Sequence, residues 1–109
     1  MDIETALYLF DRVVCQQTGA SLNNLQKAIL RGALQGWTYQ QIKEQEVSAR
    51  GYAVSYLAQY VGYELWKLLS NAFNNAGLLK QGEKVRKFNL WEYAERIAQR
   101  ELLSNLYTA

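Results

Sequence analysis

The chain has 109 residues, of which 50% are hydrophobic and 13% aromatic, and these proportions suit one small domain with a single core over residues 1–109. It contains no histidine, no proline and one cysteine, so a histidine general base, a histidine–cysteine zinc site and a disulfide framework are excluded within it. The net charge of +2 is too small to indicate a nucleic-acid protein by itself. Acidic side chains dominate the first 25 residues, and the basic excess lies towards the end of the chain.

The sequence favours a cytoplasmic location. No uncharged stretch approaches the roughly 18 apolar residues that a membrane span requires. The opening Met-Asp-Ile-Glu is acidic, unlike the basic start of a signal peptide, and Met1 suggests a native N-terminus. Whether Ala109 is the natural end or a cut stays open. The single cysteine, Cys15, is interpreted as a small core residue.

Apolar residues recur at helical spacing from the start of the chain. They predict a first amphipathic helix that stops near Thr18-Gly19 and carries Ile3, Leu7, Phe10 and Val14. Ser21 is placed to cap a second helix that ends before Gly36. The buried stripe of this second helix comprises Leu22, Leu25, Ile29 and Ala33.

The third helix has the best-defined start. Thr38 and Gln41 form the pattern of a capping box, in which each side chain satisfies a backbone donor near the other residue. Trp37 and Ile42 stand at the positions of a hydrophobic staple, so we expect the helix to begin at the next residue, Tyr39. Two endings fit the sequence: Ser48 caps the next helix, or the third helix continues to Arg50 with Gly51 as a left-handed terminator.

A long fourth helix is predicted to run to about Asn75 and to end at Gly77, with Val54, Leu57, Val61, Leu65, Leu68 and Ala72 on its buried stripe. Asn89 with Glu92 signals a last helix, whose predicted buried face is Trp91, Ala94, Ala98, Leu102 and Leu106. The predicted fold is therefore all-α, with about five helices, a central helix-turn-helix, and the first and last helices packed together.

Two stretches of the sequence resemble known families. The run 22–42 is similar to the start of the helix-turn-helix domain of bacterial quorum-sensing response regulators. The strings Gly51-Tyr52, Tyr56-Leu57, Val61-Gly62, Leu65-Trp66-Lys67-Leu68-Leu69-Ser70 and Gly82-Glu83-Lys84-Val85 carry a closer resemblance. They resemble the N-terminal helix-turn-helix-like domain of large bacterial signalling ATPases of the vWA–MoxR-associated type, over roughly residues 6–96. Segments 44–50 and 74–81 are longer than the family pattern.

The resemblance implies a signalling role as an input or adaptor module. It also favours Gly51-Tyr52 as the turn before the recognition helix, which we place at about residues 53–72; the alternative start lies near Ser48. The first hypothesis is a DNA-binding domain of the transcription-regulatory type, in which this helix contacts double-stranded DNA. The base-facing candidates are Tyr52, Ser55, Tyr56, Gln59 and Tyr63, among which Gln59 suits adenine. The phosphate-contacting candidates are Lys43, Arg50, Lys67, Lys80, Lys84, Arg86 and Lys87.

The alternative hypothesis is a protein-interaction or oligomerisation domain. No lysine or arginine lies between Gly51 and Trp66, so the commonest contact to guanine is missing from this helix. A tyrosine stripe stands there instead, with Tyr52, Tyr56 and Tyr63 at helical spacing and Tyr60 beside them. Tyrosine is enriched where one protein surface covers another. The basic segment 80–87 is interpreted as a solvated connection, a DNA-backbone contact or a contact for an acidic partner.

An enzyme is not expected. No pair of carboxylates is isolated on an apolar face, and no glycine-rich phosphate loop or metal-ligand spacing occurs. We therefore expect no cofactor, no metal and no small-molecule substrate. The tryptophans are assigned to structure: Trp37 as a staple, Trp91 as core, and Trp66 as packing against the first or last helix.

Overall fold

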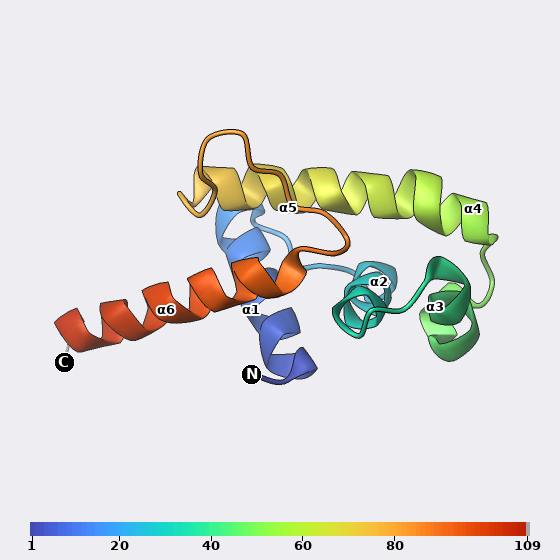
Figure 1. Ribbon diagram of the computed structural model, residues 1–109, viewed down its shortest axis with the longest axis horizontal. Coiled ribbons are helices and arrows are strands. Elements are labelled where there is room, and N and C mark those ends of the chain that lie inside the picture. The colour runs from blue at the N-terminus through green and yellow to red at the C-terminus, as the bar shows by residue number, and fades with distance from the viewer. Residues whose placement is uncertain (109) are drawn as a thin grey trace.

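The computed structural model describes residues 1–108, and side chains as far as Asn105. Within these residues the chain forms helices and loops without a strand, which confirms the all-α prediction (Figure 1). The elements are α1 (Ile3–Thr18), α2 (Asn24–Leu34), α3 (Tyr39–Gln45), the 3-10 turn η1 (Val47–Ala49), α4 (Val54–Tyr56), η2 (Leu57–Gly62), α5 (Tyr63–Asn75) and α6 (Leu90–Thr108). Since α4, η2 and α5 run on without a break, they form one helix, called here the 54–75 helix, and the described residues contain five helices.

The first helix has the predicted boundaries. The Asp2 carboxylate accepts a hydrogen bond from the Thr5 backbone N–H at 2.7 Å, and hydrogen bonding to Thr5 holds the pKa of Asp2 below its ordinary value. Gly19, with φ of 80°, ends the helix in the left-handed conformation. Cys15 is exposed, which contradicts its assignment to the core. It follows the last buried residue of the helix, Val14, and so lies on the outward side.

The predicted cap of the second helix is wrong. Asn23, not Ser21, precedes the helix and forms a capping box with Gln26, with hydrogen bonds of 2.8 and 2.9 Å. Leu22 is buried before the helix starts, and its N–H donates to the Asp11 carboxylate at 2.7 Å. These contacts keep residues 22–23 outside the helix, so the helix begins at Asn24, two residues later than a cap at Ser21 predicts.

The third helix begins as predicted but ends earlier than either expectation. Thr38 and Gln41 form the capping box, with hydrogen bonds of 2.8 and 3.1 Å, and Tyr39 is the first helical residue. The chain then turns inward as η1 and buries Ala49 completely. Gly51 is not left-handed, and Ser48 does not cap the next helix, because Ala53 takes that position without a side-chain hydrogen bond.

The 54–75 helix contains a π-helical segment at Leu57–Gly62. The i to i+5 pattern of a π segment shifts the following side chains around the helix axis. After this segment Leu69 is fully buried where Leu68 was predicted, and Leu68 is half-buried. Of the rest of the predicted stripe, Leu57, Leu65 and Ala72 are buried, and Val54 and Val61 are half-buried. The helix ends at Gly77, with φ of 73°, as predicted.

The core lies where α1, α5 and α6 meet. The rings of Phe10 and Phe73 are 5.6 Å apart, and those of Phe73 and Tyr93 are 5.9 Å apart. Arg12 and Glu101 join α1 to α6 through a 2.7 Å ion pair, so the predicted pairing of the first and last helices is confirmed. In Figure 1 the last turns of α6 extend beyond the other helices.

The predicted buried face of the last helix is correct at Ala94, and Ala98 packs half-buried against the core, but Trp91 and Leu102 are not buried. Leu90, Tyr93, Ala94 and Ile97 are buried. Trp91 is 36% exposed and donates its indole N–H to the Leu34 carbonyl at 2.9 Å, while Leu102 is 63% exposed and Leu106 lies outside the residues with described side chains. Asn89 does not supply the expected cap, because its side chain closes the preceding loop by bonding the backbone of Arg86 and Lys84.

Candidate functional site

Two glycines let the three helices of the helix-turn-helix approach closely. A β-carbon at Gly32 of α2 would overlap the side chain of Ile42 and lie 3.3 Å from the ring of Trp37, so the staple of α3 packs directly on this glycine. A β-carbon at Gly62 would overlap the hydroxyl of Tyr39 in the same way. The helices are thus in backbone-close contact, which fixes how the 54–75 helix is presented.

Tyr39 and Trp66 join α3 to the 54–75 helix. The indole N–H of Trp66 donates to the Tyr39 hydroxyl at 3.2 Å, and burial raises the pKa of that hydroxyl. The sequence did not predict this bond to α3, and the packing of Trp66 against the first or last helix stays a prediction. Its indole N–H finds its partner on α3 because Gly62 leaves room for the tyrosine between the two helices.

The turn before the 54–75 helix is held by a lysine. The Lys43 ammonium group donates to the carbonyls of Arg50 and Tyr52, at 2.9 and 2.5 Å. These two bonds draw the turn at 50–53 against α3. Lys43 was predicted to contact DNA phosphates, but its donors already satisfy backbone acceptors within the domain.

Three tyrosines form an exposed stack, and we call them the tyrosine ladder: Tyr52 from the turn at 50–53, and Tyr56 and Tyr60 from the 54–75 helix. Consecutive ring centroids are 5.4 and 5.3 Å apart, with interplanar angles of 15° and 19°. The four-residue spacing places the rings above one another. The side chains are 43%, 43% and 59% exposed. The ladder is an ordered aromatic surface that faces solvent.

All five predicted base-facing residues are exposed, but they do not share one arrangement. Ser55 and Gln59 are exposed on the same helix as the ladder. Tyr63 stands outside the ladder, with the Lys67 ammonium 5.6 Å above its ring. The stripe predicted from the sequence comprised Tyr52, Tyr56 and Tyr63, with Tyr60 only beside it. The regular spacing of 52, 56 and 60 was the signal that could have identified it as the third member.

The predicted phosphate contacts fall into two groups. Lys87, like Lys43, is engaged within the domain: it donates to the Trp37 carbonyl, lies 5.4 Å from the centre of the Tyr39 ring, and has its pKa lowered by burial. The other five are exposed: Arg50, Lys67, Lys80, Lys84 and Arg86.

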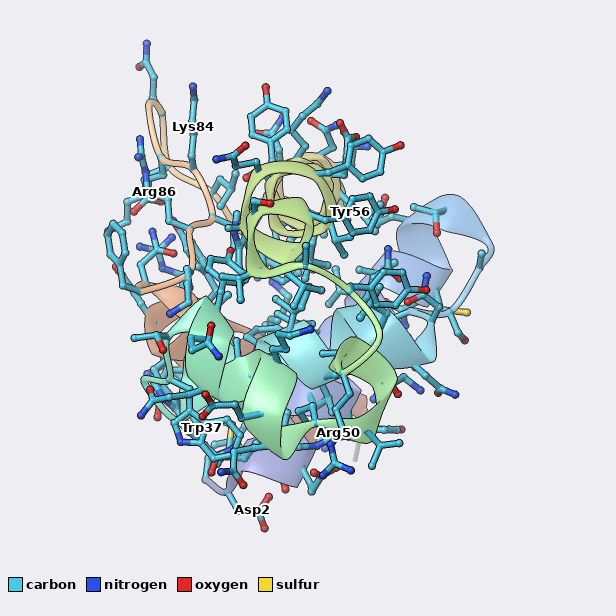
Figure 2. The ribbon with its side chains drawn as sticks, turned by 90° about the vertical axis from the view of Figure 1, so that its right-hand side faces the viewer. Asp2, Trp37, Arg50, Tyr56, Lys84 and Arg86 are labelled. Atoms are coloured by element: carbon cyan, nitrogen blue, oxygen red, sulfur yellow. The ribbon has the colours of Figure 1, made fainter. Side chains whose placement is uncertain are left out.

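The exposed cations do not surround the tyrosine ladder. In Figure 2, which looks along the 54–75 helix, Tyr56 lies on one side of the helix and Lys84 and Arg86 lie on the other. Arg50 lies below, on the turn (Figure 2). The candidate base contacts and most of the candidate phosphate contacts therefore belong to different surfaces.

The order of elements is that of a helix-turn-helix: α2, α3, the turn at 50–53, and a longer helix whose outer face is free. A family model described as vWA-MoxR associated protein N-terminal HTH matches residues 1–97. The chain belongs to this family. No curated protein and no solved structure matches it. The family match confirms the closer of the two resemblances seen in the sequence, and the more distant similarity to quorum-sensing regulators stays a prediction.

Two further features of this helix-turn-helix domain bear on its chemistry. Across residues 1–108, none of the helices combines the length and the apolar character needed to cross a membrane. In the same residues no group of three or more histidine, cysteine, aspartate or glutamate side chains is placed to hold a metal ion.

Proposed function

We propose that this domain is a protein-interaction domain rather than an enzyme, acting in the cytoplasm, and that the tyrosine ladder is its contact surface. The observation that carries the proposal is the stack of three rings, each 43–59% exposed. Tyrosine provides a large apolar area with a polar tip, and it is enriched at protein interfaces. Rings that are already stacked lose little freedom on binding, which favours affinity.

The charge distribution supports a protein partner over DNA. A protein that binds a duplex neutralises several phosphates with lysine and arginine. Two of the seven candidates, Lys43 and Lys87, bond backbone carbonyls instead. No cation lies on the stretch between Gly51 and Trp66. A duplex docked on the ladder would meet aromatic rings where its backbone requires positive charge.

DNA binding is the second candidate function. It is favoured by the helix-turn-helix family and by the exposure of Ser55 and Gln59, whose side chains suit base edges. Fluorescence anisotropy with a labelled generic duplex at low and moderate salt tests it. Affinity that is micromolar or tighter and falls steeply with salt would support it, and absence of binding at low salt would eliminate it.

A photo-crosslinking residue on the ladder face tests the main proposal. Benzoylphenylalanine replaces Gln59, which is exposed beside the ladder, and a matched protein carries it at Tyr8, which is 62% exposed on α1. Both proteins are irradiated in cells of the source organism. We expect crosslinks from position 59 to a defined protein, or to a second copy of the chain, that survive nuclease treatment and are absent from position 8. Crosslinks to nucleic acid, or equal products from both positions, would refute the proposal.

A further inference from the structure

A groove lies beside the 54–75 helix, and two residues of its lining, Lys84 and Arg86, lie across this helix from Tyr56 (Figure 2). Its walls are α5 and the loop 79–86, and its volume is about 750 Å³. Sites that bind a ligand typically enclose about 300–1,000 Å³. The half-buried side chains of Trp66 and Leu79 supply apolar surface within it. The groove therefore combines the size and the partly apolar lining of a binding site.

The loop wall of the groove is fixed before any ligand arrives. The Val85 N–H donates to the Ser70 hydroxyl at 2.9 Å and ties the loop to α5. Arg96 of α6 donates twice to the Glu83 carboxylate, at 2.6 and 2.8 Å, and the Lys80 N–H donates to the same carboxylate at 2.6 Å. A held loop loses little freedom on binding.

The groove is strongly positive. One cation, Lys67, comes from α5, and three come from the loop: Lys80, Lys84 and Arg86. The only acidic side chain that lines it is Glu83. Hydrogen bonds from Arg96 lower the pKa of Glu83 to about 2, and the guanidinium balances its charge. Four cations thus remain without a compensating anion in the lining.

We infer that this groove binds an acidic peptide segment of a partner protein, one that carries an apolar side chain between its carboxylates. The carboxylates match cations on both walls, and the apolar side chain matches Trp66 and Leu79. This site goes beyond the ladder contact, because none of its lining residues belongs to the ladder, and Lys84 and Arg86 lie across the helix from Tyr56 (Figure 2).

Nucleic acid fits the groove less well. A duplex presents its phosphates on a convex surface, and cations that line two facing walls do not reach such a surface together. A single strand binds by stacking bases on free aromatic faces. The ring of Tyr63 already carries the Lys67 ammonium 5.6 Å from its centre, and Trp66 is half-buried and bonded to Tyr39.

Fluorescence anisotropy with a short labelled peptide of alternating glutamate and leucine tests the inference, using the 109-residue chain. The control peptide has lysine at each glutamate position. Lys84→Glu and Arg50→Glu each reverse one exposed charge, but only Lys84 lines the groove. We expect the acidic peptide alone to bind, Lys84→Glu to weaken it about tenfold, and Arg50→Glu and Tyr56→Ala to leave it unchanged.

Amide chemical shifts locate the bound peptide on the same sample. We expect the perturbed amides to lie in 66–71 and 79–86. The inference is overturned if the acidic peptide does not bind, if Lys84→Glu and Arg50→Glu weaken it equally, or if the shifts centre on 52–60. A labelled duplex or single strand that binds more tightly than the peptide and depends on Lys84 would also overturn it, and would assign the groove to nucleic acid.

Discussion

The interior of the helix-turn-helix and the outer face of its last helix have opposite character. Inside, a single added carbon at Gly32 or Gly62 would overlap a neighbouring side chain. Outside, the tyrosine ladder keeps 43–59% of each side chain exposed, and its rings stack on one another. Since the fold depends on the inner contacts and not on the ladder, substitutions on the two sides should separate stability from binding.

The largest loss of stability is expected for Gly32→Ala. The new methyl group would overlap the side chain of Ile42, which is fully buried and branched at Cβ, so it cannot move aside without displacing α3. Overpacking of this kind destabilises the fold by about 1–3 kcal/mol. This loss exceeds the stabilisation expected from the higher helix propensity of alanine. Urea denaturation followed by circular dichroism measures the change.

Gly51→Ala is the matched control for this substitution. A β-carbon at Gly51 meets nothing within 4 Å, and the residue does not have a positive φ. We therefore expect alanine to stabilise the domain by about 0.4–1 kcal/mol, because it lowers the conformational entropy of the unfolded chain. Equal losses at positions 32 and 51 would contradict the packing argument.

A smaller loss is expected for Gly62→Ala. The added carbon would overlap the Tyr39 hydroxyl and approach the Leu57 carbonyl oxygen to 2.9 Å, which disturbs the π-helical segment. We expect a loss of about 1–2 kcal/mol and a change in the fluorescence of Trp66, whose indole bonds that hydroxyl. Removing the hydroxyl with Tyr39→Phe in the same chain should restore part of the stability. A double variant no more stable than Gly62→Ala would place the strain elsewhere.

The sequence predicted the fold where local signals were sufficient. The capping box at Thr38 and the glycines at positions 19 and 77 gave helix ends that the structure confirms. It failed where tertiary contacts decide. The π segment shifts the buried stripe towards Leu69, and no periodicity in the chain announces it.

The candidate site was predictable only in part. Exposure of Tyr56 followed from its position on a predicted helix, and Tyr52 is exposed as predicted although it lies in the turn before that helix. The hydrogen bonds of Lys43 and Lys87 to backbone carbonyls could not be predicted in this way, because the carbonyls lie 7 to 50 residues away in the chain. The groove depends on the bond between Ser70 and Val85, which joins a helix to a loop 15 residues later.

The third prediction concerns the pH dependence of stability that arises from the ion pair of Glu83 and Arg96. The pKa of Glu83 lies at about 2 in the folded chain against an ordinary 4.5, so its pairing stabilises the fold above pH 4.5 and is lost as the pH falls towards 2. We expect the melting temperature of the native chain to fall over this window, and that of Glu83→Gln to fall less. Glu95→Gln, exposed on α6, should keep the native slope. Parallel profiles for native chain and Glu83→Gln would contradict the assignment.

The smallest change in stability is expected for Tyr56→Ala, although it removes the middle ring of the ladder. Its ring contacts those of Tyr52 and Tyr60 at 5.4 and 5.3 Å, but all three are exposed, so we expect a loss below about 1 kcal/mol, similar to that of Tyr8→Ala. Binding should respond differently. With benzoylphenylalanine at position 59, Tyr56→Ala should abolish the protein crosslink while Tyr8→Ala retains it, because only the former divides the ladder into two isolated rings. A Tyr56→Ala variant that unfolds would show that the ladder supports the fold, and one that still crosslinks would show that the partner contacts another surface.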